Sequence, residues 1–264
     1  MSRRRWAVVG TAIGLLLIAV AAFMVYRVYF TGQALDIVEL QRTLLDVVDE
    51  DELKQELKRV HPVVPPGKQS RYQLFVTPGD SAVVALAEQA AGSRECYTAA
   101  VQWTWVSDVT LNGVKEKWLM PHEFLEDTPA YASNPVAPKV ASDCEEQANT
   151  LASVLRADGT SAEEVRVVLG RVNFGGEVGG HAWVEVHHDG KWLPLETTSG
   201  PFWDDDKGKW FPRNGYPFDY FLGHDYPVEQ VWAYYNDVYF LDPRDGSGNA
   251  PDSWRQPALL EGAP

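Results

Sequence analysis

A cysteine and a histidine in this chain stand in settings that suit nucleophilic chemistry. Cys144 lies in the segment Ser142-Asp143-Cys144-Glu145-Glu146-Gln147, where a helix is predicted to begin, and His181 follows 37 residues later at the head of a predicted strand. A thiol in the first turn of a helix can attack a carbonyl carbon when an imidazole beside it takes the proton. The pair therefore predicts a cysteine nucleophile with a histidine base.

The cysteine is predicted to start a helix that packs on the core. Ser142 or Asp143 is a suitable N-cap, and Ser142-x-x-Glu145 has the form of a capping box. Apolar residues follow at three- and four-residue steps and predict the buried face: Ala148, Leu151, Ala152 and Leu155. The unpaired N–H groups of this end favour the thiolate, whereas Glu145 and Glu146 oppose it unless they point to solvent.

The histidine strand is predicted to belong to a hairpin whose turn is Asp189-Gly190. With a two-residue turn there, His181 faces Thr198, and Glu196 is its diagonal neighbour on the same face, about 7–8 Å away at Cα. A turn at His188-Asp189 would pair the two directly, and a three-residue loop would place them on opposite faces. The hairpin can thus supply an imidazole and a carboxylate that orients it.

Other sites compete with this interpretation. Cys96 and Cys144 are the two cysteines of the chain, and their number alone also fits a disulfide. A zinc site built from His181, His187 and His188 lacks a cysteine pair, and Asp204-Asp205-Asp206 lacks the spacing of a calcium loop. We therefore expect no metal and no cofactor.

The N-terminus carries an apolar segment. Ala7 to Tyr26 is twenty residues without a charge, preceded by three arginines and followed closely only by Arg27. This length and charge bias predict a single membrane-spanning anchor over residues 1–30, with the N-terminus cytoplasmic and the remainder extracytoplasmic. A cleaved signal peptide is the alternative, because Ala19-Val20-Ala21 resembles a cleavage site.

The part after residue 30 is acidic, with 19 basic and 37 acidic residues. Nucleic acid is excluded as a partner because the clustered Lys and Arg that phosphate binding requires are absent. The expected partners are a protein or peptide substrate and the membrane, and the oligomeric state stays open.

The remaining elements are expected in four regions of the chain. After the anchor, residues 31–70 hold an amphipathic helix (34–60), which packs on the domain or forms a short coiled coil, and a Pro-rich spacer. Residues 71–245 form the catalytic domain, and 246–264 form a flexible tail. Within the domain we expect a strand over Tyr72–Val76 and helices over about 81–91 and 93–106.

The residues resemble the transglutaminase-like superfamily of papain-type folds, in particular its prokaryotic cysteine protease branch. The similarity covers about Ala99 to Leu241. It rests on Trp118-Leu119-Met120-Pro121-His122-Glu123-Phe124-Leu125, on the segment that begins Asp143-Cys144-Glu145-Glu146-Gln147-Ala148, and on the hairpin from His181-Ala182-Trp183 to Leu195-Glu196-Thr197-Thr198.

The resemblance implies roles for individual residues. Cys144 would be the nucleophile, His181 the general base and acid, and Glu196 the orienting carboxylate, where the family more often has Asp. Trp105 stands where transferase members use a tryptophan to support the oxyanion, although a position in the core is the favoured interpretation of this residue. Cys96 matches no functional position of the family.

We therefore expect an α+β fold, with a nucleophile helix packed on an antiparallel sheet behind an N-terminal transmembrane helix. The expected protein is a membrane-anchored extracytoplasmic thiol enzyme that cleaves or transfers amide bonds of peptides or proteins, either a cysteine peptidase or amidase or a transglutaminase-type acyltransferase. The alternative is a catalytically silent binding module at the cell envelope.

Overall fold

The computed structural model describes residues 67–255. Four α-helices lie in this part of the chain: α4 (Ser81–Ala90), α5 (Ser93–Ala100), α6 (Asp108–Asn112) and α7 (Cys144–Ala157). They are joined by nine strands: β1 (Thr104–Trp105), β2 (Ala141–Ser142), β3 (Val165–Phe174), β4 (Glu177–His188), β5 (Lys191–Leu195), β6 (Phe202–Asp204), β7 (Lys209–Phe211), β8 (Val228–Tyr235) and β9 (Phe240–Leu241).

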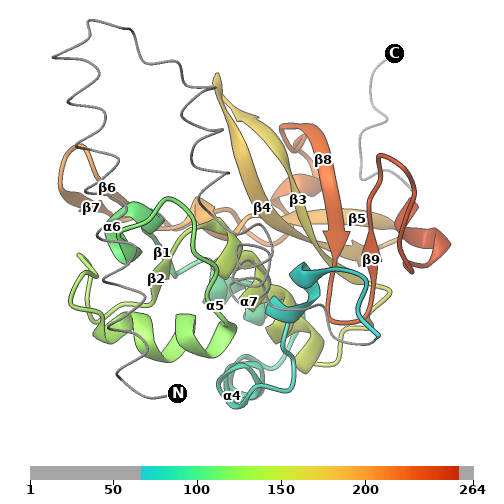
Figure 1. Cartoon of the computed structure of the whole chain (residues 1–264), viewed down its shortest axis with the longest axis horizontal. Coiled ribbons are helices and arrows are strands. Elements are labelled where there is room, and N and C mark those ends of the chain that lie inside the picture. The colour runs from blue at the N-terminus through green and yellow to red at the C-terminus, as the bar shows by residue number, and fades with distance from the viewer. Residues whose placement is uncertain (1–66, 256–264) are drawn as a thin grey trace, which may run out of the picture. The chain divides into compact units, whose positions relative to one another are not determined.

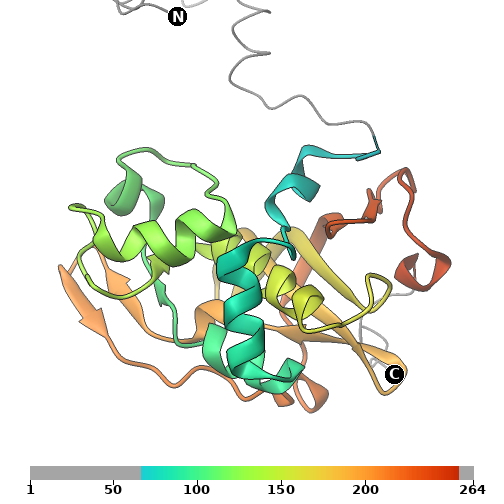
Figure 2. The same ribbon diagram turned by 90° about the horizontal axis from the view of Figure 1, so that it is seen from below.

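A five-stranded antiparallel sheet forms the centre, in the order β5-β4-β3-β8-β9. Helix α7 packs against β3 and β4 and also contacts α4 and α5, so it lies between the sheet and the other helices (Figures 1 and 2). This explains why ten of its fourteen residues are buried, well beyond the predicted apolar face. The expected helix on an antiparallel sheet is thus present.

Two buried polar residues of α7 form hydrogen bonds with neighbouring elements. Asn149 accepts a hydrogen bond from the Tyr235 hydroxyl of β8 at 2.7 Å, and Ser153 accepts one from the Thr77 amide at 2.9 Å. Because an unpaired buried polar group costs about 1–3 kcal/mol, these contacts fix the helix against the sheet. They therefore hold the residue at its first turn, Cys144, in place.

A second, smaller sheet has the order β2-β1-β6-β7 and was not predicted. Strand β1 pairs in parallel with β2, Thr104 with Ala141 and Trp105 with Ser142. Strand β2 ends two residues before Cys144, so this sheet sets the position from which α7 starts.

Two elements differ from the sequence-based expectations. Residues 71–75 form a 3-10 helix rather than a strand, because Ser70 caps the Tyr72 amide while Gln73 accepts from the Ser70 amide. The helix expected over 93–106 ends at Ala100, and the chain then enters β1, where Trp105 pairs with strands on both sides. Helix α4 lies as predicted, capped by Asp80.

The C-terminal segment also departs from the expected flexible tail in its described part. Asp252–Arg255 forms a 3-10 helix, and the Trp254 side chain is 1% exposed. Its indole N–H donates to the Glu163 carbonyl, and its own carbonyl accepts from Arg166 at 2.8 Å. A buried aromatic residue thus attaches this segment to the domain.

The predicted anchor over residues 1–30 and the amphipathic helix over 34–60 lie outside the described residues. Within residues 67–255, no helix has the length and apolar character required to cross a bilayer.

Candidate active site

Cys144 is the first residue of α7, and its sulfur lies beside strand β4. Asp143, one of the two N-cap residues that the sequence predicts, is the N-cap and has an extended backbone conformation. Its side chain makes no capping hydrogen bond. The predicted capping box does not form, because the Ser142 hydroxyl donates instead to the Glu146 carboxylate at 2.8 Å. The backbone N–H of Ala182 in β4 lies near enough to the Cys144 sulfur to lower the pKa of the thiol. The thiol therefore sits next to the residue that follows His181.

The hairpin of β4 and β5 has the predicted two-residue turn. Asp189 and Gly190 have φ values of 49° and 80°, the left-handed conformations that such a turn requires. Pairing runs from His188 opposite Lys191 to Val184 opposite Leu195, which is the predicted register. Continuing that register makes His181 and Glu196 diagonal neighbours.

The His181 imidazole and the Glu196 carboxylate are in direct contact. His181 Nε2 lies 2.8 Å from Glu196 Oε2, and the two side chains are 10% and 2% exposed. The same oxygen accepts from the Tyr226 hydroxyl at 2.6 Å, while the other oxygen accepts from the amide and the hydroxyl of Thr198. A carboxylate held by several donors fixes the ring through Nε2.

The electrostatics of this pair favour its charged form. Burial lowers the pKa of His181, but the charge of Glu196 and its hydrogen bond, with a smaller effect of Glu145, outweigh it and leave the pKa above its usual value. Burial raises the pKa of Glu196, yet the charge of His181 and the donors on the carboxylate hold it below its usual value.

The Cys144 thiol is in a setting that favours its neutral form. Burial and the charges of Glu145 and Asp143 raise its pKa well above 9.0, and the thiol donates to the Glu145 carboxylate with Sγ and Oε2 3.0 Å apart. The nearby Ala182 amide acts in the opposite direction. The acidic neighbours, rather than the helix end, thus dominate the thiol.

An acidic cluster lies behind the nucleophile. The carboxylates of Asp108, Asp143 and Glu146 offer oxygen atoms within 4.8 Å of one another, and burial raises the pKa of each. Such oxygens are ligands for hard cations. Several of them already accept hydrogen bonds: Glu146 from the Leu119 amide at 2.8 Å, and Asp108 from Asn112 at 2.7 Å. Glu146 thereby joins the Trp118–Leu119 segment to the nucleophile helix.

Trp105 lies in β1, paired with Ser142 two residues before Cys144. Its backbone amide donates to the Pro201 carbonyl at 2.9 Å, and its side chain is partly exposed. The structure thus places Trp105 beside the strand that leads into the nucleophile. Its role in supporting an oxyanion stays a prediction.

Both cysteines are free thiols in the structure. Cys96 is buried in α5, and burial together with the charge of Asp158 raises its pKa to about 11. The disulfide that the cysteine count allowed is therefore not formed, and the two thiols differ in their surroundings.

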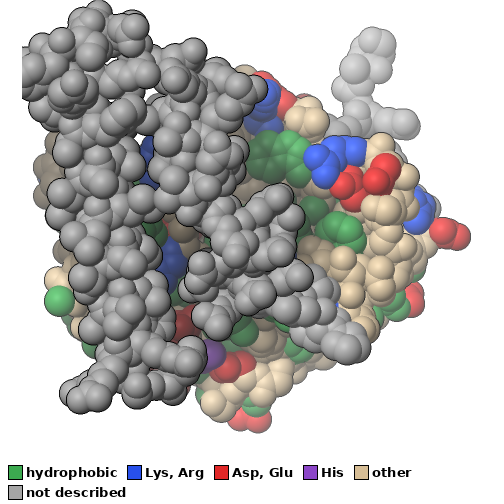
Figure 3. Space-filling view, in the orientation of Figure 1, with side chains coloured by type: hydrophobic (Ala, Val, Ile, Leu, Met, Phe, Trp, Pro, Cys, Tyr) green, Lys and Arg blue, Asp and Glu red, His purple; other side chains and the backbone are tan. Residues whose placement is uncertain are grey.

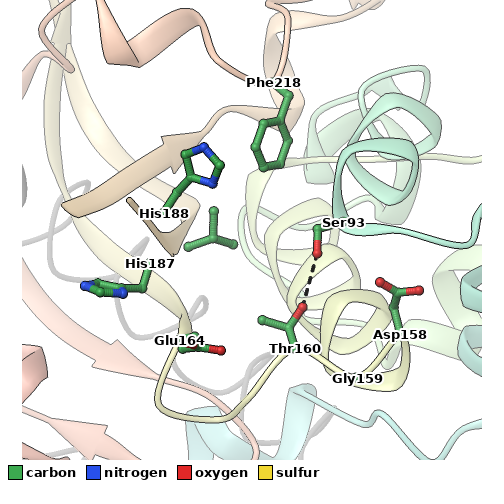
Figure 4. Close-up of a pocket in the computed structure, with 9 residues that line it drawn as sticks. Ser93, Asp158, Gly159, Thr160, Glu164, His187, His188 and Phe218 are labelled. Atoms are coloured by element: carbon green, nitrogen blue, oxygen red, sulfur yellow. Dashed lines mark hydrogen bonds between the residues drawn. The ribbon is translucent and has the colours of Figure 1, made fainter. Parts of the chain in front are cut away.

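His187 and His188 lie away from His181. They line a cavity of about 350 Å³ together with Ser93, Asp158, Gly159, Thr160, Glu164, Val186 and Phe218 (Figure 4). In Figure 4 the imidazole of His188 lies beside the Phe218 ring, and a dashed line joins Ser93 and Thr160. This cavity contains none of Cys144, His181 and Glu196, so the three histidines do not converge on one zinc site.

Two contributors to the site were not recognised from the sequence. Tyr226 has no place in the sequence-based prediction, although its hydroxyl contacts Glu196, and Thr198 enters that prediction only as the register partner of His181. The Thr-Thr pair directly after Glu196 is the signal that could have indicated a capped carboxylate, since Glu196 is the N-cap of the short helix Thr197–Ser199. Nothing local to Tyr226 predicts its contact, which depends on the sheet.

Comparisons with known proteins found a family model and several solved structures similar to this chain. The sequence model of the transglutaminase-like superfamily matches residues 114–197, and no curated protein matches the chain significantly. Calcium-bound LapG of Legionella pneumophila aligns with a TM-score of 0.40 and 13% identity over 77% of this chain and 94% of LapG. A candidate cysteine protease from Cytophaga hutchinsonii aligns with a TM-score of 0.34 and 13% identity over 58% of this chain and 44% of that one.

The matched segment runs from just before Trp118 to just past Glu196. It contains α7, the β4–β5 hairpin and all three residues that the sequence predicts to act together. Residues 114–197 of this chain thus match the transglutaminase-like superfamily.

Proposed function

We propose that this protein is a thiol enzyme that cleaves or transfers amide bonds of peptides or proteins through Cys144, His181 and Glu196. The observation that carries the proposal is the contact of the His181 imidazole with a buried carboxylate, with Nε2 2.8 Å from Glu196 Oε2, while the amide of the next residue, Ala182, lies near the Cys144 sulfur. Nucleophile, base and orienting group are thus supplied by one helix and one hairpin.

The reaction begins with attack of the Cys144 sulfur on the amide carbonyl carbon, while its proton passes to Nδ1 of His181. Glu196 stabilises the imidazolium through Nε2. The backbone N–H of Cys144, at the start of α7, stabilises the oxyanion, with Trp105 as the side-chain candidate for a second donor. The imidazolium then protonates the leaving amine, and a thioester remains on Cys144.

The second half of the reaction resolves the thioester. His181 removes a proton from the acceptor, which attacks the thioester carbon and releases the thiol. Water as acceptor gives a peptidase or amidase, whereas a primary amine gives a transglutaminase. The resemblance of the residues to the prokaryotic cysteine protease branch favours hydrolysis.

Site-specific alkylation tests the proposal. The purified protein is treated with iodoacetamide at neutral pH, and labelled cysteines are mapped by mass spectrometry. We expect Cys144 to react in preference to Cys96, and we expect this preference to be lost in His181→Ala. Cys96 is the internal control, because it is buried in α5 and carries no predicted role.

The opposite outcome favours a catalytically silent binding module. Equal labelling of the two cysteines, or no labelling of Cys144, would mean that the thiol is not activated. In that case the Cys144→Ser variant would keep any ligand affinity that the wild-type protein has.

We also propose that the domain is held at the outer face of a membrane by the segment 7–26. The support is the uncharged length of this segment and the three arginines before it. Sequencing of the N-terminus of the mature protein tests the anchor, which fails if the chain is found to begin near Ala22.

A further inference from the structure

The first half of strand β4 has one edge without a strand partner in the described part of the chain. Strand β3 pairs with β4 from Glu177 onward, whereas β5 begins to pair only at Val184. The residues between these two points border the thiol, since Ala182 contacts Cys144. The free edge therefore leads directly away from the nucleophile.

The direction of the backbone groups along this edge follows from the pairing. In an antiparallel pair, successive residues turn their N–H and C=O groups to alternate sides. His187 donates to Glu164 on the β3 side, so the odd-numbered residues of β4 face β3. The even-numbered ones face outward: Val184 pairs with β5, and the Ala182 N–H meets the Cys144 sulfur. Gly180 and Val178 consequently turn their backbone groups to the same outer edge.

This edge is open to another backbone. Val178, Gly179 and Gly180 are all exposed. A Cβ added at Gly179 would meet nothing within 4 Å, and one at Gly180 would meet only the Trp232 ring, at 3.3 Å. Glycine in a strand permits close approach of a second chain.

Apolar side chains lie on both faces of the edge. The Phe174 ring is 5.7 Å from the His181 ring on one face, and Trp232 lies against Gly180 on the other. Phe174, Val178 and Trp232 are 39%, 52% and 36% exposed, and Figure 3 shows hydrophobic side chains at the surface over β3, β4 and β8. A strand added here would place its alternating side chains against these groups.

We propose that the substrate binds as an extended peptide that adds a strand to β4 at Val178 and Gly180, with apolar side chains toward Phe174 and Trp232. The inference rests on the proposed function, because the edge ends at the Cys144 thiol. Two residues of a strand span about 7 Å, so the peptide residue bonded to Gly180 is about two positions from the one presented to the sulfur.

A backbone methylation scan tests this mode of binding. The parent probe is acetyl-Ala-Leu-Ala-Phe-Ala vinyl sulfone, and the thiol adds across its carbon–carbon double bond. The scan compares this probe with a series of analogues, in each of which one amide nitrogen is methylated. We expect the rate of Cys144 labelling to fall roughly fivefold at every second position and less than twofold between them, because each lost hydrogen bond contributes about 1 kcal/mol.

A uniform effect of methylation along the probe, or a peptide probe that reacts no faster than methyl vinyl sulfone, would overturn the proposal. Either result is what we expect if another segment of this chain, or a second copy of it, covers the edge of β4. Iodoacetamide labelling of Cys144 is measured in parallel. If iodoacetamide does not label Cys144, the proposed function itself is contradicted. If alkylation is normal but the methylated probes show no alternating pattern, only the proposed strand addition is contradicted.

A matched pair of variants gives an independent measurement. Val178→Pro removes the outward N–H of an edge position, where proline is tolerated, and Val178→Thr keeps it. We expect the proline variant to react with the peptide probe five- to tenfold more slowly than the wild type, and the threonine variant to stay within twofold of it. Both variants should react with iodoacetamide at the wild-type rate, which would show that the site is intact. Equal rates for the two variants would contradict the proposal.

Discussion

The Cys144 thiol donates a hydrogen bond to the carboxylate of Glu145, the next residue of its own helix, with Sγ and Oε2 3.0 Å apart. This contact and burial keep the pKa of the thiol above its usual value. This setting favours the neutral thiol. In the reaction that we propose, His181 would therefore remove the thiol proton as a general base during attack, rather than start from a preformed thiolate–imidazolium pair.

Glu145→Gln should make the thiol more reactive near neutral pH. The substitution removes a negative charge that disfavours the thiolate, so the pKa of Cys144 falls and a larger fraction ionises. We expect the pH profile of iodoacetamide alkylation to shift to lower pH and the rate at pH 7 to rise several-fold. Glu88→Gln, on the exposed surface of α4, is the control and should leave the profile unchanged. An unshifted profile in Glu145→Gln would mean that the contact does not control the thiol.

Glu196→Gln should abolish most of the activity while the fold is kept. The amide cannot stabilise the imidazolium, and loss of an orienting carboxylate costs on the order of 10³- to 10⁴-fold in turnover. Because Glu196 raises the pKa of His181 and burial lowers it, the pKa of His181 in the variant falls. The limb of the rate profile that reports His181 should therefore move to lower pH. A variant with turnover within tenfold of the wild type would exclude Glu196 from the triad.

Tyr226→Phe tests the second donor on the same carboxylate oxygen. The hydroxyl lies 2.6 Å from Glu196 Oε2 and helps to hold the pKa of Glu196 below its usual value. Its removal should raise that pKa and shift the acid limb of the rate profile upward, with a loss of roughly three- to tenfold in turnover. Tyr220→Phe is the matched control, because Tyr220 is partly exposed and its ring stacks on His224. Identical profiles for the two variants would assign Tyr226 to packing alone.

The local parts of the site could be predicted from the sequence, and the parts that depend on long-range contacts could not. The start of α7 follows from capping residues and apolar spacing, and the pairing of His181 with Glu196 follows from the Asp189-Gly190 turn. In both cases the signal lies within about ten residues along the chain. Tyr226 contacts Glu196 across thirty residues, and no local pattern encodes that contact.

The same division explains the errors in the fold. The short, mostly apolar run 72–76 predicts a strand, but the capping chemistry of Ser70 and Gln73 dominates once these residues pack on the domain. The smaller sheet joins Trp105 to Ser142 and Phe202, segments whose strands are only two or three residues long. Such short strands carry too little periodicity to be recognised.

Glu146→Gln should stabilise the protein increasingly as the pH rises. Burial and neighbouring carboxylates raise the pKa of Glu146 above 4.5, so the fold favours its protonated form. The corresponding stability is fully present below pH 4.5 and is lost as the pH rises through the raised pKa. Glutamine stays neutral and keeps an oxygen for the Leu119 amide. We expect the difference in melting temperature between variant and wild type to grow from pH 5 to pH 8, and no such trend in the exposed control Glu126→Gln.

Trp254→Ala tests whether the C-terminal segment belongs to the folded domain. The indole is buried beside Trp192 and Tyr239, with ring centroids 6.2 and 5.8 Å away, and its N–H donates to the Glu163 carbonyl. Truncation of a buried tryptophan costs about 3–5 kcal/mol of the free energy of unfolding, which chemical denaturation measures. Arg255→Ala removes an exposed side chain whose ion pair with Asp252 spans 3.8 Å, and should cost less than about 1 kcal/mol. A loss below about 1 kcal/mol in Trp254→Ala would return this segment to the flexible tail that the sequence predicts, because a side chain that is not packed in solution has no contacts to lose.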